Sequence, residues 1–80
     1  MALTTLRKKD LNRLLQAVPK LVDLPAARMW VDYDAGADVL YISFRLPQQA
    51  DESELRDDGI IVHRRGKRIV GVTILEASQR

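Results

Sequence analysis

The stretch GIIVHRRGKRIVGVTIL, residues 59–75, decides the fold of this chain. Apolar residues recur with a period of two in both of its arms, which is the pattern of β-strands. Arg65-Gly66 stands between the arms, where a tight hairpin turn is expected. The stretch therefore predicts one strand over residues 59–64 and a second over residues 67–75, paired as an antiparallel hairpin.

The alternation also occurs upstream and predicts a second hairpin. Strands are expected over residues 29–33 and 39–45. Between them, DAGAD at residues 34–38 supplies turn chemistry, because aspartates bond their own backbone and Gly36 can take a positive φ. Residues 47–57, PQQADESELRD, are polar, acidic and without a period, so they are predicted to form a long loop.

An amphipathic helix is predicted ahead of the sheet. Its apolar residues recur at i, i+3, i+4 and i+7 and are Leu11, Leu14, Leu15, Val18, Leu21 and Val22. Thr4, Thr5 or Asp10 can cap its start by accepting a hydrogen bond from a free backbone amide. Because Pro19 lacks an amide hydrogen and crowds the preceding turn, the helix is expected to end near Val18, with a short second turn beginning at Pro19.

The predicted fold class is α+β. An N-terminal helical extension (residues 1–28) precedes a four-stranded antiparallel β-sheet domain of two hairpins (residues 29–80), and together they are expected to form one compact domain. A chain of 80 residues without cysteine has neither disulfides nor thiolate metal sites to stabilise it, so oligomerisation is the means that remains. No apolar run approaches the roughly 20 residues of a membrane span, and no secretory signal is recognised, so a cytoplasmic protein is expected.

The last predicted strand is apolar on both faces and therefore needs cover on both sides. One helix can cover only one face of a small sheet. The second face would present Trp30, Val39, Tyr41, Ile69 and Leu75. A large exposed apolar patch usually marks an interface, so we predict a homodimer, or a complex with another small protein, through that second face or through the helix.

Three strings in the predicted sheet resemble a known family. They are YDAGADVLYI at residues 33–42, DGIIV at residues 58–62 and IVGVTILEAS at residues 69–78. In this order they resemble the domain-of-unknown-function family 2283, over about residues 29–79. The resemblance implies a small prokaryotic protein with an α+β or mostly β fold. It supplies no catalytic residues, and some members look like the antitoxin halves of toxin and antitoxin pairs.

The sequence offers little for catalysis or metal binding. His63 is the sole histidine, and none of its possible serine partners, Ser43, Ser53 and Ser78, lies in a G-x-S-x-G pattern. The carboxylates nearest to a cluster are Asp32, Asp34, Asp38, Asp57 and Asp58. Their spacing departs from that of a calcium-binding loop. No catalytic residue, metal or cofactor is therefore predicted.

Charge is segregated along the chain. Residues 1–28 carry six basic and two acidic groups, residues 29–58 carry two basic and eight acidic, and residues 59–80 carry five basic and one acidic. Such segregation favours complementary self-association or an oppositely charged partner.

We therefore predict a non-enzymatic protein-interaction module, an antitoxin or a regulator, that masks a small basic or nuclease-like partner. The residues expected to bind it are Asp51, Glu52, Glu54, Asp57, Asp58, Trp30 and Tyr41. The alternative is a nucleic-acid-binding dimer, in which cations displace counterions from phosphates. Its residues would be Arg64, Arg65, Lys67 and Arg68 at the last hairpin, with Arg7, Lys8, Lys9 and Arg13 at the helix start.

Overall fold

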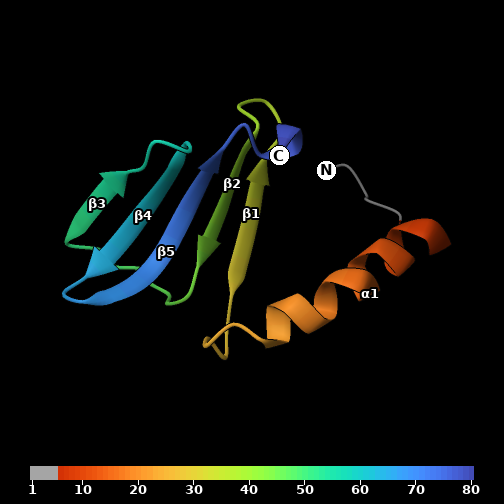
Figure 1. The fold of residues 1–80 in the computed structure, drawn as a ribbon, viewed down its shortest axis with the longest axis horizontal. Coiled ribbons are helices and arrows are strands. Elements are labelled where there is room, and N and C mark those ends of the chain that lie inside the picture. Colours follow the sequence, from red (N-terminus) through yellow and green to blue (C-terminus); the bar gives the residue numbers. More distant parts are fainter. Residues whose placement is uncertain (1–5) are drawn as a thin grey trace.

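The computed structural model describes residues 6–80, and within this range the chain forms one α-helix, five strands and a 3-10 turn (Figure 1). The elements are α1 (Lys8–Val22), β1 (Trp30–Asp34), β2 (Val39–Ser43), β3 (Glu52–Leu55), β4 (Ile60–Arg65), β5 (Arg68–Leu75) and η1 (Ala77–Gln79). The strands form a single antiparallel sheet in the order β1-β2-β5-β4-β3. The α+β class is confirmed, but the sheet has five strands where four were predicted.

The additional strand is β3, which lies inside the segment predicted to be a loop. All four of its residues are exposed, and it pairs with β4 at the edge of the sheet. Charged side chains are common on such edges because they discourage pairing with other chains. Since no side of β3 is buried, the strand carries no apolar period that sequence reasoning could detect.

The connection from β2 to β3 passes the ends of β5 and β4 and places β3 at the far edge of the sheet. Strand β5 therefore pairs with β2. Together with the β3-β4-β5 meander this is a Greek-key arrangement in which the long connection comes first. Backbone hydrogen bonds secure both ends of the connection, from the Phe44 amide to the Val70 carbonyl and from the Asp51 amide to the Arg64 carbonyl.

One face of the sheet is apolar across four strands. Residues opposite each other in antiparallel strands share a face, and Ile42 and Val62 both lie opposite Val72. We call this the apolar face; its residues are Val31, Tyr33, Leu40, Ile42, Ile60, Val62, Val70, Val72 and Ile74. Only its centre is well buried, with Val62 and Val70 at 5% and 4% exposure.

The other face, called here the mixed face, combines apolar and polar side chains. The residues predicted to form a second apolar surface share it, but to different degrees: Val39 is buried and Leu75 is half-buried. Trp30, Tyr41 and Ile69 are exposed. Ser43 and Thr73 lie among them, so this face is less apolar than predicted.

Helix α1 differs from its prediction at Pro19, which lies inside the helix and does not end it at Val18. The proline removes one backbone donor near the end of the helix, but the Asp23 amide then bonds the Pro19 carbonyl at 3.2 Å and the helix continues through Val22. At the start, the Arg7 amide donates to the Asp10 carboxylate at 3.0 Å. The other candidate caps, Thr4 and Thr5, lie outside the described residues.

Helix α1 runs away from the β1 edge of the sheet and covers neither face (Figure 1). The structure describes every residue of α1, and none of them is buried. The radius of gyration is accordingly 14.1 Å, whereas a compact chain of this length has about 11.6 Å.

A hydrogen-bond cluster around Asp38 joins the β1–β2 turn to the C-terminal η1 turn. The Asp38 carboxylate accepts bonds from the Tyr33 hydroxyl at 2.7 Å, the Ser78 hydroxyl at 2.8 Å and the Ser78 amide at 3.0 Å. The Asp38 carbonyl accepts the Ala77 amide at 3.0 Å. We call this cluster the Asp38 staple.

The two tight turns depend on different residues from those predicted. The last hairpin turns at Gly66-Lys67, one residue later than expected, and Gly66 has φ 61°. In the first hairpin Gly36 has no positive φ; Asp38 takes it instead, at 55°.

Gly66→Ala is expected to lower the free energy of unfolding by about 1 kcal/mol, because an L side chain is strained in the left-handed region. No atom within 4 Å would meet the new Cβ, so strain alone is tested. Gly36→Ala is the matched control, since its nearest new contact, Asp34 Oδ1 at 3.5 Å, is ordinary. Urea unfolding measures both variants, and equal effects would contradict the assignment.

The Asp38 staple predicts a loss of stability in acid. Bonds donated first by Tyr33 and then by Ser78 hold the pKa of Asp38 below its ordinary value. A lowered carboxylate pKa stabilises the fold above the unfolded-state pKa of about 4, and this contribution is lost as the pH falls through the folded-state value.

Tyr33→Phe removes the first of these bonds and should flatten that acid dependence, with a lower melting temperature at pH 7. Tyr41→Phe is the control, because within the described residues the Tyr41 hydroxyl has no hydrogen bond to the protein. Thermal unfolding between pH 7 and pH 2 tests both variants. Identical pH profiles for them would show that the staple does not contribute.

Candidate protein-interaction surface

One side of α1 is an exposed apolar surface. The side chains on it are Leu11, Leu14, Leu15, Val18, Leu21 and Val22, and all are exposed. Leu15, for example, is 55% exposed. Arg13, Gln16 and Lys20 lie on the opposite side of the helix, so the polar side is mainly basic. The predicted amphipathic pattern is therefore present, but nothing within residues 6–80 covers its apolar half.

A groove of about 840 Å³ lies where the linker after α1 meets the ends of β2 and β5. Its walls are Leu24, Pro25, Ala26, Ala27, Phe44, Arg45, Arg65, Arg68, Ile69 and Val70. Gln49 holds two of the arginines, its side-chain oxygen accepting from Arg45 at 3.2 Å and its carbonyl from Arg65 at 3.0 Å. The linker therefore forms one wall of the groove, and the ends of β2 and β5 form the others.

The acidic residues predicted to bind a partner lie along β3 and its flanking turns, and most are engaged within the chain. Glu54 pairs with Arg64 at 2.9 Å. Asp51 accepts the Gly66 amide at 3.2 Å, and Asp58 pairs with Arg56 at 2.9 Å. The structure describes Glu52 and Asp57 without an ion pair within 4.0 Å, so the edge offers less free negative charge than its composition indicates.

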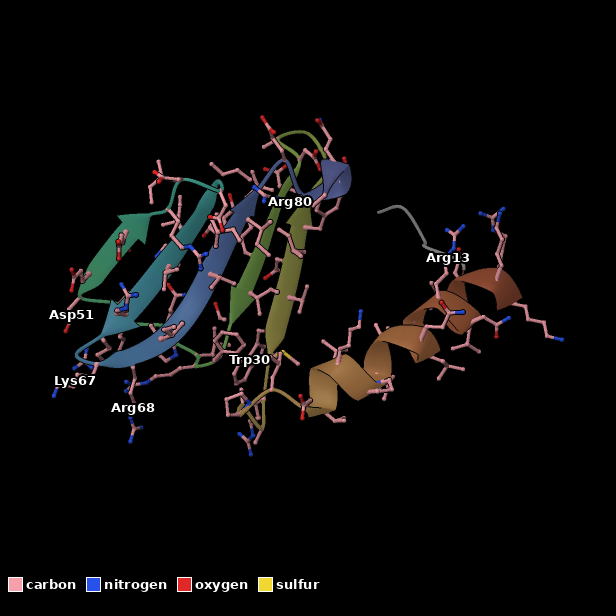
Figure 2. The ribbon with its side chains drawn as sticks, viewed as in Figure 1. Arg13, Trp30, Asp51, Lys67, Arg68 and Arg80 are labelled. Carbon is pink, nitrogen blue, oxygen red and sulfur yellow. The ribbon has the colours of Figure 1, made fainter. Side chains whose placement is uncertain are left out.

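The basic residues of the nucleic-acid alternative are not gathered on one surface. Arg64 and Arg65 are engaged by Glu54 and Gln49, respectively. Lys67 and Arg68 project from the β4–β5 hairpin, whereas Arg13 lies at the opposite end of the molecule on α1 (Figure 2). The two predicted basic groups therefore do not form a continuous track along one chain.

One hydroxyl–imidazole arrangement occurs on the mixed face. Ser53 Oγ lies 2.7 Å from His63 Nδ1, and His63 Nε2 lies 2.8 Å from Thr73 Oγ1. The second ring nitrogen thus meets a hydroxyl and not the carboxylate that would orient a catalytic imidazole. The other candidate serines are elsewhere, with Ser43 bonded to Gln48 and Ser78 in the Asp38 staple. Within residues 6–80, no three metal-ligating side chains gather.

Ser53 was one of three serines named as possible partners of His63, but the sequence did not single it out, because the contact depends on the pairing of β3, which carries no apolar period. The groove was missed because periodicity does not show that the linker lies near the ends of β2 and β5. Trp30 and Tyr41, predicted to bind a partner, lie exposed on the mixed face. The part of the chain that the structure describes has no helix with the length and apolar character of a membrane span.

The sheet and the Asp38 staple coincide with the segment that is shared with other proteins. The model of the family described as "Protein of unknown function (DUF2283)" matches residues 30–78, from the first residue of β1 to the serine of the staple. No curated protein and no solved structure matches the chain. Since the match covers more than half of the sequence and confirms the resemblance of its three motifs, the chain belongs to this family of proteins of unknown function.

Proposed function

We propose that this protein is a non-enzymatic, cytoplasmic protein-interaction module whose main binding element is α1. The observation that supports the proposal is the exposure of a whole apolar helix side that no other part of the described chain covers. More specifically, we propose a regulatory role of the antitoxin type. In this role the docked helix masks a surface of another protein.

The physical argument begins with the stability of the helix. A helix of 15 residues is marginal in water unless its apolar side packs against something. Burying one leucine or valine side chain contributes about 1.5–3 kcal/mol, and six such side chains are available on α1. Because the part of the chain that the structure describes covers none of them, a binding partner is the natural source of this stabilisation.

The polar side of α1 indicates what the partner surface contains. Within Lys8–Val22 the charged residues are Lys8, Lys9, Asp10, Arg13 and Lys20. An apolar surface rimmed by carboxylates would match both the stripe and this positive charge. Helix-in-groove docking of this kind uses the i, i+3, i+4 and i+7 positions that α1 presents.

Leu15→Lys is expected to weaken partner binding at least tenfold, because it places a charge within the apolar stripe and removes about 1.4 kcal/mol or more of burial. Gln16→Lys adds the same charge on the opposite side and should bind as the wild type does. Lysine and leucine have similar helix propensities, so the intrinsic helix tendency changes little.

The measurement is a pull-down with tagged protein from nuclease-treated lysate, together with the native mass of each purified variant. Equal retention of partner by both variants would show that the stripe is not the binding element. A wild-type protein that is a monomer and retains nothing would overturn the proposal.

Nucleic-acid binding receives less support from the geometry, because Arg64 and Arg65 are engaged and the basic groups are separated. We expect no specific binding of short DNA or RNA duplexes in fluorescence anisotropy at moderate salt. Binding that weakens steeply with salt, and that falls further in Arg68→Ala, would favour the alternative instead.

A further inference from the structure

We infer that the partner of α1 is the apolar face of a second copy of this chain, in a two-fold dimer in which each helix covers the other copy's sheet. The inference rests on the proposed function and names the partner. Both surfaces are present in one chain and both lack cover, so a reciprocal exchange completes them together.

The exposed area of the chain is large enough for the interface of a stable dimer. The chain exposes 6807 Å², whereas a compact monomer of 9.1 kDa exposes about 4,900 Å². The excess is therefore about 1,900 Å², and stable dimers bury about 800 Å² or more on each copy. The excess therefore exceeds the area that one copy buries in a stable dimer.

The dimensions of the two surfaces also agree. A helix of 15 residues is about 22 Å long, and a sheet of five strands is about 19 Å across. One helix can thus span the width of the sheet and cover its exposed rows. Val31 and Tyr33, the most exposed apolar-face residues, are 58% and 52% exposed and would gain the most from this cover.

The charges of the two surfaces are complementary. Residues 7–22 carry five basic and one acidic group, and residues 29–58 carry eight acidic and two basic. Glu52, for which the structure describes no ion pair, borders the apolar face on the β3 side, since it lies opposite Arg64 in the register, and Glu54 on the same border pairs with Arg64. The basic flank of a docked α1 would therefore meet the carboxylate of Glu52.

The path of the linker favours a second copy over the helix's own sheet. The linker joins α1 to the edge strand β1, and α1 runs away from that edge (Figure 1). Pro25 restricts the backbone within the linker. Folding back onto its own sheet would require the linker to reverse its direction, whereas exchange with a second copy keeps its path. Such a contact is the same on both copies and closes the assembly.

The test places a nitroxide on α1 and reads its effect on a different copy. The chain has no cysteine, so Asn12→Cys provides one labelling site beside the stripe. The Asn12→Cys chain carries the nitroxide and no isotope label, and the wild-type chain is labelled with ¹⁵N. The two chains are refolded together, and the broadening of the amide signals of the ¹⁵N chain is recorded by NMR. A second sample that also carries Leu15→Lys on the labelled chain is the control.

The expected result is a native mass twice that of one chain, with broadening of β2, β4 and β5 amides of the ¹⁵N copy that disappears in the control. A dimer in which only α1 amides broaden, or only those of the β1 edge, would overturn the inference and leave the interaction module in place. A monomer that still retains another protein through α1 would do the same. A monomer that retains nothing would overturn both.

Discussion

The strands β2, β5 and β4 place a continuous group of branched aliphatic side chains on one face, and a sheet with such a face is stable only against a second layer. The centre of that group is buried, at Val62 and Val70, and its periphery is half-exposed or exposed. The element suited to supply the second layer, α1, lies away from both faces. The remaining features of the molecule can be understood from this separation.

Hydrogen bonds between residues far apart in sequence tie the turns of the sheet to the C-terminal segment. The Asp38 staple links the first hairpin to the last residues of the chain, and Arg80 donates to the Leu75 carbonyl and to the Asp58 carbonyl at the β3–β4 turn. The family match begins at β1 and ends at Ser78, so it spans the sheet and its staple. Helix α1, which most needs a partner, lies outside the matched segment.

The sequence was informative wherever apolar residues follow the period of a strand or a helix. The strands with alternating apolar residues and the helix with its apolar stripe were predicted within a few residues of their ends. Strand β3 was missed because Glu52, Ser53, Glu54 and Leu55 contain no apolar alternation. Pro19 was read as a helix end because propensity describes an isolated turn, and backbone bonds after the proline compensate for the missing donor.

Periodicity also cannot identify what covers an apolar side, because it records only that a side is apolar. The charges add the missing information once their pairing is known. Glu54 pairs with Arg64 and Asp51 accepts the Gly66 amide, so part of the acidic β3 edge is engaged by the neighbouring β4–β5 hairpin. On α1, Asp10 pairs with Arg7 and leaves an excess of positive charge beside the apolar stripe. Helix α1 therefore lacks cover for its apolar side and carries an excess of positive charge, and docking on one partner surface can compensate both.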